Sequence, residues 1–166
     1  YLLQGVTGSG KTRVYIELIK QALNSGSSAV VLVPEIALTP QLLALFEASF
    51  PQKVLSYNSG QTESQRHAVW QQALEAKDSL VVVGPRSSLF LPFQKLGLIV
   101  IDECHETTYK QEQAPRYHAI PAAAKLADLS GAKLVLGSAT PGLSEVFLAE
   151  AGKITLLKLS QRVDDR

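Results

Sequence analysis

Short apolar runs alternate along the chain with longer stretches in which apolar and polar residues recur at helical spacing. The runs occupy residues 1–4, 29–33, 54–57, 80–83, 98–101, 133–136 and 154–157. Most of them are continuously apolar, which is typical of strands that are buried on both faces of a sheet. Because helical stretches separate the runs, the order predicts an α/β fold with a mostly parallel central sheet and helices on both faces.

Polar residues mark the expected ends of several helices. The first helix carries a single apolar stripe, and the polar residues 24–26 end it. Thr39 and Thr140 each place a hydroxyl cap directly before a proline, the residue preferred at the first helical position. Residues 62–65 read Thr-Glu-Ser-Gln and fit a capping box. Residues 107–121 show no clear period and are expected to form a long loop.

Composition limits the classes of function. The 166 residues are 46% hydrophobic and 19% charged, which fits one folded domain over residues 1–166. The net charge of +1 provides no strong field for a polyanion, so any contact with nucleic acid must be local. A single cysteine excludes an internal disulfide and favours a reducing, cytoplasmic setting. No run approaches the ~18–20 apolar residues of a membrane span, so no membrane partner is expected. The chain has no Met and its motifs begin at residue 5, so we expect it to be a fragment of a larger protein.

A phosphate-binding loop follows the first apolar run. The segment matches G-x-x-x-x-G-K-[ST] at every position and reads Gly5, Val6, Thr7, Gly8, Ser9, Gly10, Lys11 and Thr12. Glycines let the backbone N–H groups wrap a triphosphate, and the helix that follows turns its positive end towards it. Lys11 is expected to contact the β- and γ-phosphates, and Thr12 to bind Mg²⁺ through its hydroxyl. The alternative, an ordinary Gly/Ser turn before a helix, explains less of the pattern.

Two adjacent carboxylates follow a buried apolar run. Asp102 is placed at the carboxyl end of a predicted parallel strand, where such sheets bind ligands, and is expected to bind Mg²⁺ directly or through water. Glu103 is expected to polarise the water that attacks the γ-phosphate. Taken alone, the pair fits two solvated side chains equally well, but the phosphate-binding loop favours the catalytic interpretation.

A small polar turn, residues 137–140, follows another apolar run. If its strand lies beside the strand of Asp102, the hydroxyls of Ser138 and Thr140 can hydrogen-bond His105 or Asp102 and report the state of the γ-phosphate. A histidine at a strand end is more often structural than catalytic, and Thr140 also fits plain helix capping. Both roles of Thr140 are compatible.

These segments resemble a known family. Residues 5–12, 102–105 and 137–141 look like motifs I, II and III of superfamily 2 helicases. Residues 33–41 (Val-Pro-Glu-Ile-Ala-Leu-Thr-Pro-Gln) and 84–93 (Gly-Pro-Arg-Ser-Ser-Leu-Phe-Leu-Pro-Phe) are similar to segments of the PriA family of primosomal replication-restart helicases. The resemblance covers nearly the whole chain.

The resemblance implies a RecA-like P-loop NTPase lobe of a DNA-dependent ATPase and 3′-to-5′ DNA helicase that acts in replication restart and primosome assembly. Its cofactors would be ATP and Mg²⁺, with no zinc in this part. Its partners would be single-stranded or forked DNA and primosome proteins in the bacterial cytoplasm. A second lobe would supply an arginine finger. Lys11, Asp102, Glu103 and His105 would form the catalytic set.

Contacts with DNA are expected in segments that follow strands. Thr39 at its helix start can hold one backbone phosphate, and Arg86 with Ser87 can hold another. The loop of residues 109–118 offers two rings for base stacking, interleaved with cations. These residues are Tyr109, Lys110, Arg116 and Tyr117. From composition alone, an ordinary surface loop is the simpler interpretation, and the resemblance reverses that balance.

Two other functions remain open. The chain can be a nucleotide-sensing scaffold that does not hydrolyse ATP, or the motor of another superfamily 2 translocase. Glu103 and the turn at residues 137–140 favour hydrolysis, because a protein that only binds nucleotide needs neither. A kinase would need an acceptor site and a lid, and the sequence shows neither.

Overall fold

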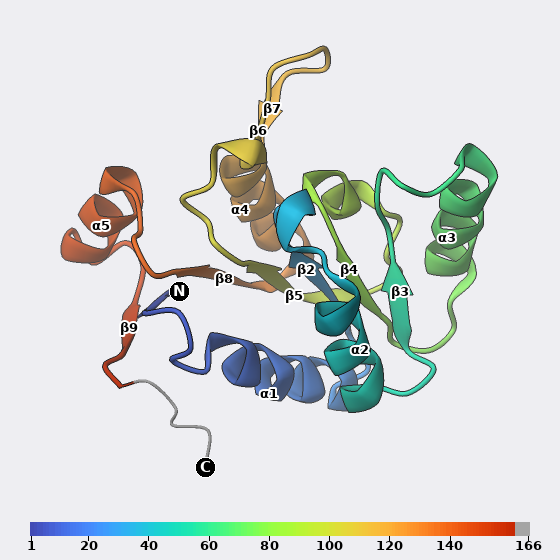
Figure 1. The fold of residues 1–166 in the computed structure, drawn as a ribbon, viewed down its shortest axis with the longest axis horizontal. Coiled ribbons are helices and arrows are strands. Elements are labelled where there is room, and N and C mark those ends of the chain that lie inside the picture. The colour runs from blue at the N-terminus through green and yellow to red at the C-terminus, as the bar shows by residue number, and fades with distance from the viewer. Residues whose placement is uncertain (162–166) are drawn as a thin grey trace.

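The structure, a computed structural model, describes residues 1–161, so the last five residues of the predicted 1–166 domain lie outside it. A seven-stranded sheet forms its centre, and every neighbouring pair of strands is parallel (Figure 1). The strands are β1 (Leu2–Gly5), β2 (Ser28–Leu32), β3 (Val54–Ser56), β4 (Val81–Gly84), β5 (Leu96–Ile101), β8 (Lys133–Ser138) and β9 (Leu156–Leu159). Their spatial order is β3-β4-β2-β5-β8-β1-β9, which confirms the predicted parallel α/β fold.

Helices cover both faces of this sheet (Figure 1). The α-helices are α1 (Lys11–Asn24), α2 (Pro40–Ser49), α3 (Glu63–Glu75), α4 (Ala119–Ser130) and α5 (Leu143–Glu150). Short 3₁₀ turns are η1 (Glu35–Ala37), η2 (Arg86–Phe90) and η3 (Thr107–Tyr109). One core contains buried residues of α1 and α2, and the other contains those of α3 and α4. No helix in residues 1–161 is long and apolar enough to cross a membrane.

The continuous apolar runs supply both cores at once. In β2, Ala29 and Val31 belong to the core beneath α1, whereas Val30 and Leu32 belong to the core beneath α4. Successive side chains of a strand point to opposite faces, so a central strand covered on both faces must be apolar at every position. This arrangement explains the pattern from which the fold was predicted.

Two of the predicted helix caps are confirmed. The Thr39 hydroxyl accepts a hydrogen bond from the Leu42 amide, 3.3 Å away, at the start of α2. Thr62 and Gln65 form the expected capping box at α3. The third cap is wrong, because α5 begins at Leu143 with Gly142 as its cap. The Ser138 hydroxyl instead accepts from the Thr140 amide at 3.0 Å, which uses this segment in a turn before the helix.

The expected long loop at residues 107–121 is also wrong. It contains η3, a two-stranded antiparallel hairpin of β6 (Lys110–Gln111) and β7 (Tyr117–His118), and the first turn of α4. The hairpin projects away from the body of the molecule (Figure 1). Its strands are too short to show a period of two. His118 caps α4, because its Nδ1 accepts from the Ile120 amide at 3.3 Å. The last strand was predicted at residues 154–157 and lies two residues later, at Leu156–Leu159.

The order of the strands places the predicted motifs together. β8 lies between β1 and β5, so the carboxyl ends of these three strands are adjacent. They carry the phosphate-binding loop, the Gly137–Ser138 segment and Asp102 respectively. The ends of β2 and β4 lie on the other side of β5 and carry Val33 and Arg86. The same edge of the sheet therefore joins two halves, one with the nucleotide motifs and one with predicted DNA contacts.

Candidate nucleotide-binding site

The loop between β1 and α1 has the backbone of a phosphate cradle. Gly8 and Gly10 take left-handed conformations, with φ of 79° and 86°, which side chains with a Cβ rarely adopt. The Ser9 hydroxyl is buried and has no hydrogen-bond partner among the described residues. A buried hydroxyl without a partner is unfavourable, so this atom is suited to receive a ligand oxygen. These features are those expected of a phosphate-binding loop, and triphosphate binding by Gly5 to Thr12 stays a prediction.

Lys11 lies at the start of α1 with its ammonium group held inside the loop. Its Nζ donates to the Gly5 carbonyl at 2.9 Å and lies 3.4 Å from Glu103 Oε1. The Lys11 side chain is 8% exposed and that of Glu103 is 29% exposed, so the ion pair is partly shielded from solvent. The predicted phosphate-binding and water-polarising residues are therefore in direct contact. An anionic ligand that bound the Lys11 ammonium would compete with Glu103 for this ion pair.

The backbone at Glu103 is unusual for a residue with a side chain. Its φ is 45°, in the left-handed region that costs a non-glycine residue roughly 1–2 kcal/mol. β5 ends at Ile101, and beyond this turn the Glu103 side chain reaches Lys11. Such strain is typical of functional positions that the surrounding structure holds in place. The following residue, Cys104, is buried and donates its amide to the Gly137 carbonyl at 2.9 Å.

Asp102 is surrounded by groups that act on its charge in opposite directions. Burial raises the pKa of the carboxyl above its ordinary value, whereas a hydrogen bond from Tyr15 and the ammonium of Lys11 lower it. The Tyr15 hydroxyl donates to Asp102 Oδ1 at 2.8 Å. Tyr15 is one of the residues of the apolar stripe that predicted the first helix, with Val14, Leu18, Ile19, Ala22 and Leu23, and no sequence signal showed that its hydroxyl reaches the carboxylate.

The predicted contact between His105 and the β8 turn is present. His105 Nδ1 lies 2.8 Å from Ser138 Oγ and 3.6 Å from Glu103 Oε2. The same Ser138 oxygen accepts from the Thr140 amide. Ser138 is fully buried, so this hydroxyl acts as a fixed junction between His105 and the segment leading to α5. The arrangement links the end of β5 with the end of β8 around Glu103.

Tyr109 does not offer a ring for base stacking, and that prediction is wrong. Its side chain is 1% exposed and belongs to the core beneath α4. Its hydroxyl lies 3.0 Å from the Leu32 carbonyl and 2.5 Å from the Asp102 carbonyl. The ring is buried because the loop folds back over the ends of β2 and β5. Tyr109 thus bridges the two halves of the sheet edge directly behind Asp102.

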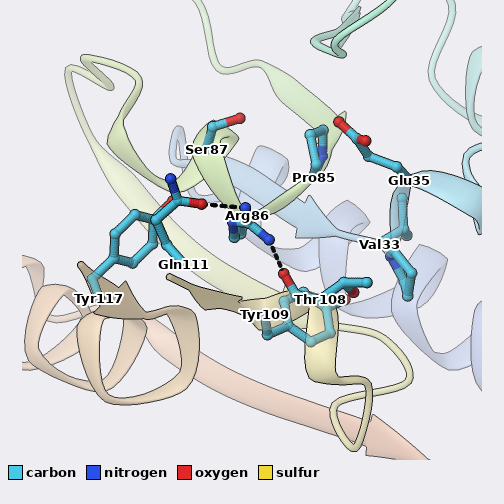
Figure 2. A pocket seen from close by; sticks show the side chains of 10 residues that line it. Val33, Glu35, Pro85, Arg86, Ser87, Thr108, Tyr109, Gln111 and Tyr117 are labelled. Atoms are coloured by element: carbon cyan, nitrogen blue, oxygen red, sulfur yellow. Dashed lines mark hydrogen bonds between the residues drawn. The ribbon is translucent and has the colours of Figure 1, made fainter. Parts of the chain in front are cut away.

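A pocket of about 240 Å³ lies beside this bridge, over the ends of β2 and β4 (Figure 2). Arg86 lies in it and donates to the Thr108 carbonyl and to Gln111 Oε1 (Figure 2). Its guanidinium therefore binds the start of the hairpin, next to Tyr109. Ser87 is exposed at the same pocket. The sequence predicted Arg86 as a phosphate contact but not this internal role.

Three other predicted DNA contacts lie together on the hairpin: Lys110, Arg116 and Tyr117. Lys110 and Arg116 are exposed, and both are near Glu112: Lys110 Nζ lies 3.7 Å from its carboxylate, and Arg116 Nε donates to its carbonyl at 3.0 Å. Tyr117 packs edge-on against Phe90, with ring centroids 5.0 Å apart. Phe90 is 57% exposed and was missed, because a single aromatic in an apolar run carries no signal of its own.

A magnesium site here would rest on few protein ligands. Among residues 1–161, no group of three or more His, Cys, Asp or Glu side chains is placed to hold a metal ion. Mg²⁺ at nucleotide sites commonly keeps several waters and uses one or two carboxylates plus substrate phosphates. Asp102, whose charge interacts with the Lys11 ammonium, offers one such carboxylate, and its binding of Mg²⁺ together with the Thr12 hydroxyl stays a prediction.

Comparisons of the sequence with a family model and with individual proteins agree with one another. A sequence model of DEAD/DEAH box helicases matches residues 1–147. The chain is 46% identical over its whole length to the replication restart protein PriA of Bacillus subtilis (strain 168), of which it covers 20%. It is 48% identical over 86% of its length to PriA of Synechocystis sp., of which it covers 17%. The chain thus spans about a fifth of the length of these relatives.

Solved helicase structures share the fold at lower identity. RecG bound to a three-way DNA junction superposes with a TM-score of 0.68 at 23% identity, covering 99% of this chain and 21% of RecG. The helicase domain of Pyrococcus furiosus Hef gives a TM-score of 0.65 at 20% identity, covering 96% of this chain and 35% of Hef. These likenesses identify the fold as that of helicase motor domains.

Proposed function

Because the chain belongs to the DEAD/DEAH box helicase family and resembles PriA proteins over its whole length, we propose that it is the ATP-binding motor lobe of a DNA-dependent ATPase and 3′-to-5′ helicase in replication restart. The contact between Lys11 and Glu103 carries the proposal, because it brings the lysine of the phosphate-binding loop beside the carboxylate that we propose polarises the attacking water. The proposed partners are single-stranded or forked DNA and, in the longer relatives, replication-restart proteins.

The residues of the site have separable roles in this reaction. The N–H groups of residues 5–12 and the Lys11 ammonium bind the phosphates, and Thr12 and Asp102 hold Mg²⁺. When bound, Mg²⁺ neutralises charge that develops on the phosphate oxygens. Glu103 orients and polarises the attacking water. His105, held by Ser138, limits the positions that the Glu103 carboxylate can take.

Coupling to DNA is proposed to run through the hairpin and Tyr109. Arg86 donates hydrogen bonds to Thr108 and Gln111. Tyr109, which follows Thr108 in the chain, donates a hydrogen bond to the carbonyl of Asp102. A DNA phosphate is a strong competitor for the Arg86 guanidinium, because a phosphate carries charge and can accept two parallel bonds, whereas the present acceptors, the Thr108 carbonyl and Gln111 Oε1, are neutral. Binding of a DNA strand over this pocket would then change how Tyr109 contacts the Asp102 carbonyl.

Two variants of the intact protein test the proposed division of roles. Lys11→Ala should weaken ATP binding and abolish unwinding, whereas Glu103→Gln should retain ATP binding and lose hydrolysis. Nucleotide affinity and turnover are measured separately, with unwinding of a duplex carrying a 3′ single-stranded tail as the third readout. If both variants lose affinity equally, the roles assigned to the two residues are wrong.

A scaffold that senses nucleotide without hydrolysis is the second candidate. Its basis is the phosphate-binding loop at residues 5–12, which binds nucleotide whether or not hydrolysis follows. The same two variants distinguish it. A scaffold would lose its partner interaction in Lys11→Ala and keep it in Glu103→Gln, and the wild-type protein would release no phosphate.

A further inference from the structure

A buried tyrosine reaches the carboxylate that the proposed function assigns to magnesium. Tyr15 lies four residues after Lys11, one turn along α1, and its side chain is 1% exposed. Its hydroxyl donates to Asp102 Oδ1 at 2.8 Å. Lys11 therefore contacts the phosphate-binding loop, and Tyr15, on the next turn of the same helix, contacts the Asp102 carboxylate.

A phenylalanine would fill the same core position without a buried polar atom. Burying a hydroxyl is unfavourable unless it is hydrogen-bonded, so the Tyr15 hydroxyl is explained by its bond to Asp102 rather than by packing. The bond satisfies one lone-pair position of a carboxylate that is partly buried and interacts with the charge of Glu103. It also limits rotation of the carboxylate about its side-chain bond.

Gly137 at the end of β8 makes the contact possible. A Cβ added to Gly137 would lie 1.7 Å from the Tyr15 hydroxyl oxygen and 3.3 Å from Asp102 Oδ1. No side chain fits there while Tyr15 and Asp102 keep their positions. Three segments of the chain thus meet at one hydrogen bond: the helix after the phosphate loop, the end of β5 and the glycine before Ser138.

We propose that Tyr15 is a positioning residue: its hydroxyl orients the Asp102 carboxylate for magnesium binding. Gly137 is required because a side chain at this position would displace the Tyr15 hydroxyl. The inference rests on the proposed function, because it assumes that Asp102 binds Mg²⁺. Outer-shell hydrogen bonds to metal ligands commonly contribute about ten- to a hundredfold to metal affinity or activity. Tyr15 acts through Asp102 and need not contact nucleotide.

The test is the magnesium affinity of the intact, nucleotide-bound protein. A fluorescent ADP analogue reports binding, first in EDTA and then across a Mg²⁺ titration. Tyr15→Phe should lower the apparent magnesium affinity by about ten- to a hundredfold and leave the affinity measured in EDTA unchanged. Ile19→Val is the matched control, because Ile19 is fully buried on the same face of α1, one turn further on. It should change neither affinity.

A double-variant cycle separates positioning from packing. In an Asp102→Asn background, Tyr15→Phe should produce no further loss of magnesium affinity, because the two residues act as one unit. Gly137→Ala should reproduce the loss seen in Tyr15→Phe. The inference is overturned if Tyr15→Phe retains full magnesium affinity, loses as much in the Asp102→Asn background, or loses nucleotide affinity in EDTA.

The outcome also distinguishes this inference from its premise. If the wild-type protein binds no nucleotide, or if Asp102→Asn leaves the magnesium affinity unchanged, the proposed function fails and the inference fails with it. If Asp102→Asn lowers magnesium affinity while Tyr15→Phe and Gly137→Ala do not, only the role of Tyr15 is refuted.

Discussion

Replacing Tyr109 by Phe removes the hydroxyl that bridges the ends of β2 and β5 and retains the ring. The Leu32 carbonyl keeps the Asp102 amide as a donor at 2.9 Å, so the loss falls mainly on the Asp102 carbonyl. A lost hydrogen bond that leaves a buried acceptor costs about 1 to 2 kcal/mol. For a domain of this size, that corresponds to a fall in melting temperature of about 2 to 8 °C.

The same change should reduce stimulation by DNA more than basal ATP hydrolysis. The reason is that the Tyr109 hydroxyl contacts the Asp102 carbonyl, and Tyr109 lies next to Thr108, which accepts a hydrogen bond from Arg86. Thermal unfolding and phosphate release, with and without single-stranded DNA, measure the two effects. Tyr1→Phe is the control, since the Tyr1 ring is 47% exposed. A Tyr109→Phe protein with the wild-type melting temperature and full DNA stimulation would refute the reasoning. Tyr109→Ala is unsuitable, because emptying this core position costs about 3 to 5 kcal/mol.

Three further predictions concern the hairpin, the cysteine and the completeness of the site. Replacing Arg116 and Tyr117 together with Ala should leave basal ATP hydrolysis near normal and lower affinity for single-stranded DNA, since stacking contributes about 1 to 3 kcal/mol per base; unchanged DNA affinity in a filter-binding assay would exclude the hairpin as a contact. Cys104 should resist iodoacetamide at pH 8 until the protein is unfolded, because burial raises the pKa of its thiol to about 12 and the reactive thiolate forms only near that pH; rapid labelling of the folded protein would contradict this. The 166-residue chain alone should hydrolyse ATP poorly, because an arginine finger from a second lobe is worth about 10³ to 10⁵ in rate; turnover comparable to that of an intact DNA-stimulated helicase would show that the site needs no second lobe.

The sequence predicted the central sheet because several of its strands, such as β2 and β4, are buried at every position. A continuous run such as residues 98–101 has few other stable settings in a domain of this size, and alternation with helical stretches implied parallel pairing. It also predicted that the hydroxyls of the turn at residues 137–140 can reach His105 or Asp102, since the two segments lie at the ends of strands at the same edge of the sheet. The structure confirms one of these contacts, between Ser138 Oγ and His105 Nδ1, at 2.8 Å.

The parts that the sequence did not predict depend on side-chain direction and on very short elements. Tyr109 and Tyr117 are eight residues apart in one segment, yet the first is buried in the core and the second is half-buried on the hairpin. Nothing in their residue type distinguishes the two environments. The role of Tyr15 was hidden for a similar reason, because a tyrosine in an apolar stripe looks like core whether or not its hydroxyl has a partner. Two-residue strands such as β6 and β7 show no period.

Steady-state phosphate release by the intact protein, with and without single-stranded DNA, tests the central claim most directly. The account predicts release that requires Mg²⁺, rises when DNA is added, and is abolished in Lys11→Ala. Tight nucleotide binding with no release of phosphate under either condition would contradict it, and would identify the site of Lys11, Asp102 and Glu103 as that of a nucleotide sensor.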